Sequence, residues 1–307
     1  MKKKSFIAAL LALIVMGCST NRSGNENLID NVIYDEAKSS YMFTATNTYP
    51  VEILINGYPV ARTTASSPHN LTGIADIGIY NEGKQTLDVV IDLRQFKKEE
   101  TYQPILSFVL YQAKSKESVP GPDNTINNFE ISTNEITDDD VKDCIFTKTI
   151  TFEAQPVVNI GAWQESKDMT EYDSDKLLKM AYLAYQDFKD VINNNKLAEF
   201  TEMVELAEYE SGQLCNKRID DIKNERNAWL SNSLNLQPMN NCEVKLYGDG
   251  KLLTLVVKNE QIIDISPLYT SPGDDNGDSH YVNLYYHFPS DSENLELIRF
   301  NTDSLKN

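Results

Sequence analysis

The chain has 307 residues and a formal net charge of −18, from 46 acidic and 28 basic residues. Such a surface repels nucleic-acid backbones and anionic lipid headgroups, so nucleic acid is excluded as a partner. The same charge keeps a protein soluble or attracts a basic partner. The length predicts two domains.

Residues 1–17 are typical of an export signal, with a basic start and an apolar run over residues 6–16 that is too short to span a membrane. The motif Val15-Met16-Gly17-Cys18 resembles the lipobox of bacterial lipoproteins. This resemblance implies that Cys18 is lipidated and that its acyl chains bind the membrane. Ser19 after the cysteine implies the outer membrane of the cell envelope. The alternative is a secreted protein with an unmodified cysteine.

Residues 18–28 are predicted to form the lipidated cysteine and a flexible tether, because they are rich in Asn, Ser and Gly. The part that follows the signal carries a charge of −21, since the signal contributes three lysines and no acid. Its three cysteines are Cys144, Cys215 and Cys242, so one disulfide at most can form. We predict the pair Cys215–Cys242, which lie close in sequence. A zinc site is disfavoured because the cysteines lack short paired spacing.

Residues 29–157 are predicted to form an all-β domain, because short apolar runs alternate with turn residues. Asn56-Gly57 marks a tight hairpin, and a second hairpin is predicted at residues 81–84. Strands at this spacing favour a β-sandwich. An Ile-Asn-Gly hairpin followed by a Gly-Lys-Gln-Thr-Leu-Asp-Val strand is similar to the β-sandwich modules that accompany extracellular glycan enzymes and adhesins. That resemblance is used for architecture alone.

Residues 158–173 are predicted to be a linker, and residues 174–307 an α+β domain. Apolar residues recur at helical spacing from Leu177 onward, with Asp173 or Ser174 as the cap. After Pro238 the period changes to two, which predicts an antiparallel sheet with strands at residues 243–247, 251–257, 261–265, 281–288 and 295–300.

The helix ending Phe188-Lys-Asp-Val-Ile-Asn-Asn-Asn-Lys-Leu-Ala-Glu-Phe200, together with the later strands, resembles the nuclear-transport-factor-2-like fold. The resemblance implies helices that close over a curved sheet around a cone-shaped cavity. That fold is used by enzymes and by binding proteins, so it does not decide the function.

Two stretches carry candidate site residues. Asp274, Asn276 and Asp278 resemble the first ligands of a calcium loop, but Ser279 and Tyr285 stand where an EF-hand needs glycine and glutamate. An acidic hairpin loop is therefore favoured, and calcium is the only cofactor suggested. The second candidate is one face of the strand at residues 281–288, formed by Tyr281, Asn283, Tyr285 and His287. These side chains suit a ligand pocket or an ordinary half-exposed strand.

Three classes of function remain. No nucleophile elbow, phosphate loop, dinucleotide glycine pattern or helical zinc motif is present, so no catalytic residue is predicted. We therefore favour a membrane-tethered, non-enzymatic binding or scaffolding protein with a protein or glycan partner. The alternative is an inhibitor or immunity protein that neutralises a basic toxin, and the third is a glycan-acting enzyme with paired carboxylates.

Overall fold

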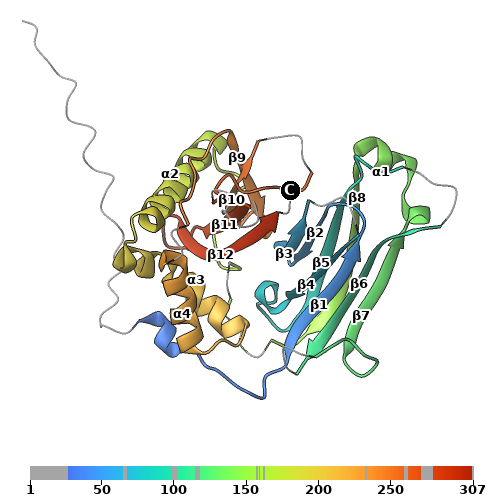
Figure 1. Ribbon diagram of the computed structural model, residues 1–307, viewed down its shortest axis with the longest axis horizontal. Helices are drawn as coiled ribbons and strands as arrows, with labels where there is room; N and C mark the ends of the chain where they lie inside the picture. The colour runs from blue at the N-terminus through green and yellow to red at the C-terminus, as the bar shows by residue number, and fades with distance from the viewer. Residues whose placement is uncertain are drawn as a thin grey trace, which may run out of the picture.

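The computed structural model describes residues 27–64, 68–97, 102–114, 118–156, 158, 160–161, 163–231, 234–258, 262–270 and 279–305. These ranges contain three four-stranded antiparallel sheets and four α-helices (Figure 1). The predicted mixture of β-sandwich and α+β structure is confirmed at this level. No helix in the described ranges is long and apolar enough to cross a membrane.

Two of the sheets pack face to face in the N-terminal part of the chain, and we call this pair the sandwich. Their strand orders are β4-β1-β6-β7 and β3-β2-β5-β8. The strands are β1 (Ser40–Asn47), β2 (Val51–Ile55), β3 (Tyr58–Thr63), β4 (His69–Ile74), β5 (Gly83–Asp92), β6 (Pro104–Ala113), β7 (Thr125–Ser132) and β8 (Ile145–Ala154). Alternate residues of β5, including Leu87 and Val89, are buried in one core with Phe43 and Phe108 from the facing sheet.

The turns of the sandwich confirm one predicted hairpin and correct another. Asn56 and Gly57 have φ values of 50° and 72° and join β2 to β3, as predicted. The hairpin predicted at residues 81–84 is wrong, because β4 pairs with β1 whereas β5 pairs with β2 and β8 in the other sheet. A short 3-10 helix, η2 (Asp76–Gly78), lies in this connection between the sheets.

The third sheet has the order β12-β11-β10-β9 and lies in the C-terminal part. Its strands are β9 (Cys242–Tyr247), β10 (Leu252–Val257), β11 (Ser279–His287) and β12 (Glu296–Leu305). The predicted hairpin at Gly248-Asp249-Gly250 is confirmed between β9 and β10, with positive φ at all three residues. Residues 262–265 form no strand, which corrects the prediction for that stretch.

Helices α2 (Ser174–Asn193), α3 (Leu197–Leu214) and α4 (Ile219–Ser231) accompany the third sheet (Figure 1). Asp173 caps α2 as predicted, because its Oδ1 accepts a hydrogen bond of 2.8 Å from the backbone N–H of Lys176. The buried side of α2, including Leu177 and Phe188, packs in one core with Leu253 and Leu284 of the sheet. The fourth helix, α1 (Asp138–Asp143), follows η3 (Thr133–Glu135) between β7 and β8.

The segment before β1 lies on the helices of the C-terminal part. It begins with η1 (Leu28–Asn31), and Ile29 and Val32 are buried against Ile222 of α4. The backbone N–H of Leu28 donates a hydrogen bond of 2.6 Å to Glu205 of α3. The residues predicted as the end of the tether and the start of the β domain are therefore held on α3 and α4, and the first sandwich strand begins at Ser40.

The other face of the third sheet packs against the β2–β3 hairpin. Tyr58 of β3 lies in one aromatic cluster with Trp163, Tyr247 and Tyr285. The two hairpin turns also touch, since the backbone N–H of Gly248 donates a hydrogen bond of 2.9 Å to the carbonyl of Gly57. A Cβ on Gly57 would lie 3.1 Å from Gly248, so glycine permits this close approach.

The hydroxyl of Tyr185 on α2 bridges β10 and β11 where these strands share a single register pair, Leu253 with Tyr286. It lies 2.8 Å from Thr254 Oγ1, donates to the carbonyl of Leu284 at 2.9 Å and accepts the N–H of Leu255 at 3.1 Å. Tyr185 is fully buried, and burial raises the pKa of its phenol. One side chain thus supplies hydrogen bonds that the open ladder lacks.

We expect Tyr185→Phe to lower the free energy of unfolding by about 1–3 kcal/mol, because backbone groups of β10 and β11 lose a partner in a buried site. Urea denaturation followed by circular dichroism measures the change. Tyr182→Phe is the matched control, since Tyr182 lies on the same helix and is 36% exposed. Equal stability losses in the two variants would contradict the bridging role.

Asp76 is a buried carboxylate near the boundary between the two parts. It is 3% exposed, and its Oδ2 accepts a hydrogen bond of 3.1 Å from the backbone N–H of Tyr41. Burial raises the pKa of Asp76 to about 7, and the nearby positive charge of Lys38 opposes the rise. Because the pKa in the fold is above that of an unfolded aspartate, the protonated form is favoured. The contribution of protonated Asp76 to the stability of the fold is complete below pH ~4 and is lost as the pH rises through about 7.

Asp76→Asn should therefore raise the free energy of unfolding at pH 8 by about 1–3 kcal/mol and change it little at pH 4. The asparagine keeps an acceptor for the Tyr41 N–H and does not ionise. Urea titrations at pH values from 4 to 8 measure the difference, with the exposed turn substitution Asp123→Asn as control. A variant less stable than the native chain at pH 8 would argue against a costly buried charge.

Candidate functional site

Of the strand face predicted to bind a ligand, Asn283, Tyr285 and His287 are buried and Tyr281 is half-buried. Tyr285 is fully buried, with its ring centroid 5.1 Å from that of Tyr58, and its hydroxyl accepts a hydrogen bond from Arg62 of β3. Asn283 is 3% exposed and donates to Asn301 at 2.9 Å, and the ring of Tyr281 lies 5.8 Å from that of Tyr269 at an interplanar angle of 35°. The structure uses these side chains for packing and internal hydrogen bonds.

His287, the fourth residue of that face, lies between a serine and a glutamate. Its Nδ1 is 2.7 Å from Ser166 Oγ, and its Nε2 is 3.6 Å from Glu296 Oε2. The order serine–histidine–glutamate is that of a hydrolase triad. However, Ser166 and His287 are only 9% and 6% exposed, so the hydroxyl is not presented to a substrate. The arrangement is a buried polar contact.

A cluster of buried polar groups lies beside Tyr285 between the third sheet and the sandwich. The Tyr247 hydroxyl donates to Glu52 at 2.8 Å and contacts Asp264 Oδ2 at 3.0 Å, and Arg62 Nη2 lies 3.8 Å from Glu52. Burial raises the pKa values of both Glu52 and Tyr247, against the attraction of Arg62. Perturbed groups often mark active sites, but this cluster is closed and joins the two parts.

The cysteines and the proposed cation loop give no site. Cys144, Cys215 and Cys242 are free thiols, so the predicted Cys215–Cys242 disulfide is not formed. Cys215 ends α3 and Cys242 begins β9, and proximity in sequence did not bring them into bonding geometry. Asp274, Asn276 and Asp278 lie outside the described residues, as does Cys18. Within the described ranges, no group of three acidic, cysteine or histidine residues could hold a metal ion.

A groove lies between α2 and α3 in the C-terminal part. It consists of two adjoining hollows of about 270 and 460 Å³ that share Asp187, Glu202 and Met203. Its floor is apolar and comprises Ala184, Val191, Met203, Leu206, Tyr286, Leu295 and Leu297. Its rim is acidic and comprises Asp187, Asp190, Glu199, Glu202, Glu205 and Glu296, and Lys196 is the one basic residue among the described lining. We call this feature the α2–α3 groove.

The helical repeat explains why the acids share this rim. Asp187 and Asp190 on α2, and Glu199, Glu202 and Glu205 on α3, are spaced three residues apart, which places each set on one helix face. Tyr286 of β11 reaches the floor from below, and its hydroxyl donates to the carbonyl of Ala184 at 3.3 Å. Burial raises its pKa well above the ordinary value. The sequence spacing could have predicted this rim, but only packing shows that the two faces meet.

The rim acids are only partly neutralised by the protein itself. Lys196 binds Glu199 at 2.8 Å, and Glu205 accepts the Leu28 N–H. Asp187, Asp190 and Glu202 have no cationic side chain within 4.0 Å in the part of the chain that is described. Partial burial and the neighbouring Asp190 raise the pKa of Asp187, with Lys196 acting in the opposite direction. The rim therefore has negative charge that a positive ligand would relieve.

The groove is suited to binding. The described residues of its lining include no serine, cysteine or histidine, and Leu183, 56% exposed, lies one turn before Asp187 on α2. An apolar floor and an acidic rim fit a molecule with one apolar face and positive charges around it. Comparison of the chain with protein-family models, with curated proteins and with solved structures gives no match. The function is therefore argued from this geometry.

Proposed function

We propose that the protein is a lipid-anchored, non-enzymatic binding protein of the bacterial cell envelope that holds a basic, amphipathic segment of a partner protein in the α2–α3 groove. The acidic rim over an apolar floor carries this proposal. An amphipathic helix buries its apolar residues in such a groove, while its lysines and arginines reach the rim carboxylates. The large negative charge of the whole chain accelerates the encounter with a basic partner.

The proposed architecture has two domains, a β-sandwich over residues 29–157 and an α+β domain over residues 174–307 that resembles the nuclear-transport-factor-2-like fold. Two observations support the second part of this proposal. The helices α2, α3 and α4 accompany one antiparallel sheet, and the groove has walls from α2 and α3 above the edge strand β12.

An inhibitor or immunity protein is the second candidate, and the same acidic rim favours it. A basic toxin would present the charges that the rim attracts. The two functions differ in their consequence for the partner. A carrier or scaffold leaves the activity of the bound protein intact, whereas an inhibitor abolishes it at stoichiometric concentration. An activity assay on the captured partner separates them.

The groove proposal is tested with a synthetic 18-residue helical peptide of leucine and lysine, with leucines on one face. Asp187→Asn combined with Glu202→Gln should weaken its binding about tenfold, because two rim charges without protein partners are removed. Isothermal titration calorimetry at 0.05 and 0.5 M NaCl measures the affinity, which should fall with salt for the native chain.

The matched control is Asp123→Asn combined with Glu243→Gln, which removes two exposed charges outside the groove. This control should bind the peptide with nearly native affinity. If both double variants lose affinity equally, attraction is a property of net charge and the groove is not the site. Tight binding that does not respond to salt would also contradict the role of the rim.

Lipid anchoring is tested separately. Cys18→Ser should release the protein from the membrane fraction without unfolding it, because the serine cannot form a thioether to the acylated glycerol. Fractionation of cells and circular dichroism of the released protein measure the two outcomes. A variant that stays with the membrane would refute the lipobox interpretation and leave the groove proposal standing.

A further inference from the structure

The two hollows of the α2–α3 groove differ in how much apolar surface they contain. The hollow of about 270 Å³ reaches β12, and the apolar residues of its described lining are Ala184, Met203, Leu206, Tyr286, Leu295 and Leu297. The hollow of about 460 Å³ lies toward the turn between the two helices, and its apolar residues are Val191 and Met203. We call these hollows the apolar end and the turn end of the groove.

Carboxylates without a cationic partner begin where the two hollows meet and continue into the turn end. Asp187 and Glu202 line both hollows, and Asp190 lines the turn end alone. Within the described ranges, none of these three exposed carboxylates has a cationic side chain within 4.0 Å, because Lys196 is bound to Glu199 at 2.8 Å. The turn end therefore presents negative charge that the protein itself does not neutralise.

The other carboxylates of the apolar end face nitrogen groups of the protein itself. Glu205 accepts the backbone N–H of Leu28 at 2.6 Å, and Glu296 Oε2 lies 3.6 Å from His287 Nε2. Leu183, one residue before the groove lining on α2, is 56% exposed and adds apolar surface at this end. Apolar surface and unneutralised charge are thus displaced from each other along the groove.

The helical repeat sets the distances along the groove. Asp187 and Asp190, like Glu199 and Glu202, are three residues apart, which is about 4.5 Å along the helix axis. Ala184, at the apolar end, precedes Asp187 by the same interval. A bound helix parallel to α2 and α3 repeats this spacing, because its residues i, i+4 and i+7 share one face. Alternate side chains of an extended chain are about 6.6 Å apart and do not match it.

The apolar end has room for one large side chain. Its volume is smaller than the roughly 300–1,000 Å³ typical of ligand pockets, so it takes a single anchor residue. Met203 in its lining is half-buried, and the flexible thioether of methionine makes favourable contacts with aromatic rings. The small side chain of Ala184 leaves space on the opposite wall. A tryptophan therefore suits this end better than a leucine.

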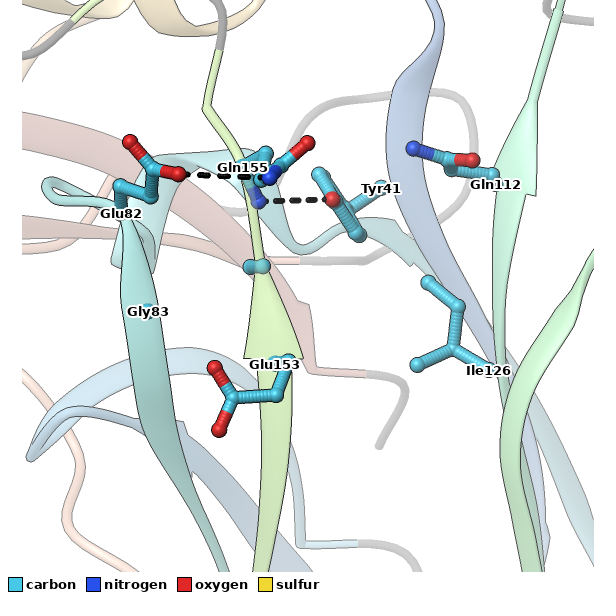
Figure 2. Close-up of a pocket in the computed structure, with 8 residues that line it drawn as sticks. Tyr41, Glu82, Gly83, Gln112, Ile126, Glu153 and Gln155 are labelled. Atoms are coloured by element: carbon cyan, nitrogen blue, oxygen red, sulfur yellow. Dashed lines mark hydrogen bonds between the residues drawn. The ribbon is translucent and has the colours of Figure 1, made fainter.

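The hollow of about 320 Å³ at one end of the sandwich offers no comparable arrangement. Figure 2 shows the carboxylate of Glu153 directed away from Gln112 and Ile126. Glu82 accepts a hydrogen bond of 3.2 Å from the side-chain amide of Gln155 (Figure 2). Glu153 is exposed on β8 and lies outside the groove, so it serves as a control position for the loss of one carboxylate.

We propose that the segment held in the α2–α3 groove is a helix with one aromatic anchor for the apolar end and basic residues one and two turns away for the turn end. This inference rests on the proposed function and names the pattern that the groove selects. The anchor packs on Met203. The nearer basic residue binds Asp187 and Glu202, and the farther one binds Asp190. Specificity arises from the spacing between anchor and charges rather than from total charge.

The test uses the full-length chain in a nonionic detergent and three capped helical peptides of equal composition. Each contains one tryptophan and two lysines in a background of alanine and glutamine. The lysines stand four and seven residues before the tryptophan in the first peptide, and four and seven residues after it in the second. In the third they stand two and five residues away, on the opposite helix face. We expect the first or second peptide to bind at least tenfold more tightly than the third in isothermal titration calorimetry.

Ala184→Leu should weaken binding of the tighter peptide about tenfold, because the larger side chain fills the apolar end and leaves every rim charge in place. The matched control is Ala198→Leu, at an exposed position of α3 outside the groove lining, which should bind with native affinity. Circular dichroism checks folding. If Ala184→Leu unfolds, Met203→Ala replaces it and should weaken the same peptide about fivefold, because the anchor loses its contact with the thioether.

The position of the charges is tested by a double-mutant cycle. Asp190→Asn should weaken the tighter peptide about threefold, and should leave unchanged the affinity for a version whose farther lysine is glutamine. Glu153→Gln is the control and should leave both affinities native. An equal effect of Asp190→Asn on the two peptides would contradict the assigned register.

Three further results would overturn the inference: all three peptides bind equally, the anchor variants bind with native affinity, or a proline-interrupted version of the tighter peptide binds as well. The last result would show an extended occupant. In each of these cases the groove proposal stands if Asp187→Asn with Glu202→Gln still weakens binding. If none of the peptides binds, including the leucine–lysine peptide, the proposed function fails together with this inference.

Discussion

The contact of Tyr58 with Tyr285 and Trp163 determines which face of the third sheet is closed to solvent. It joins the β2–β3 hairpin of the sandwich to the third sheet. The ring centroid of Tyr58 lies 5.1 Å from that of Tyr285 and 5.5 Å from that of Trp163. Burial of several aromatic rings stabilises such a junction by several kcal/mol, at roughly 25 cal/mol per Å² of apolar area. This contact closes one face of the third sheet, and helices cover the other.

Polar groups in the same junction have a different effect. The Glu52–Arg62 pair, with Tyr247 and Asp264 around it, is withdrawn from water, and the cost of desolvation offsets much of its attraction. Its hydrogen bonds are directional, whereas the aromatic contact is not. We infer that the aromatic rings supply most of the stability of the junction and that the polar cluster fixes its register. Removing the charge of either Glu52 or Arg62 would leave the other buried charge without compensation.

Local signals in the sequence predicted local structure well. Asn56-Gly57, Gly248-Asp249-Gly250 and the Asp173 cap act through their own backbone geometry, so a single segment contains the information. The wrong hairpin at residues 81–84 and the unpredicted strand β7 have non-local causes, since a turn does not specify which sheet each strand joins. Likewise, a period of two places Tyr285 and His287 on one face, but only packing decides what covers that face. The α2–α3 groove combines segments from different elements, so it was not predicted.

The N-terminal segment relates the α2–α3 groove to the proposed anchor. Glu205 lines the groove and also accepts the N–H of Leu28, so the first described residues lie beside the groove. From Cys18 to Leu28 an extended chain spans at most about 35 Å. Under the proposed lipidation, this distance keeps the groove close to the membrane surface. A basic amphipathic segment is attracted to anionic lipids as well. The acidic groove would therefore compete with the lipid surface for the same segment, and it would hold a partner at the membrane without inserting it.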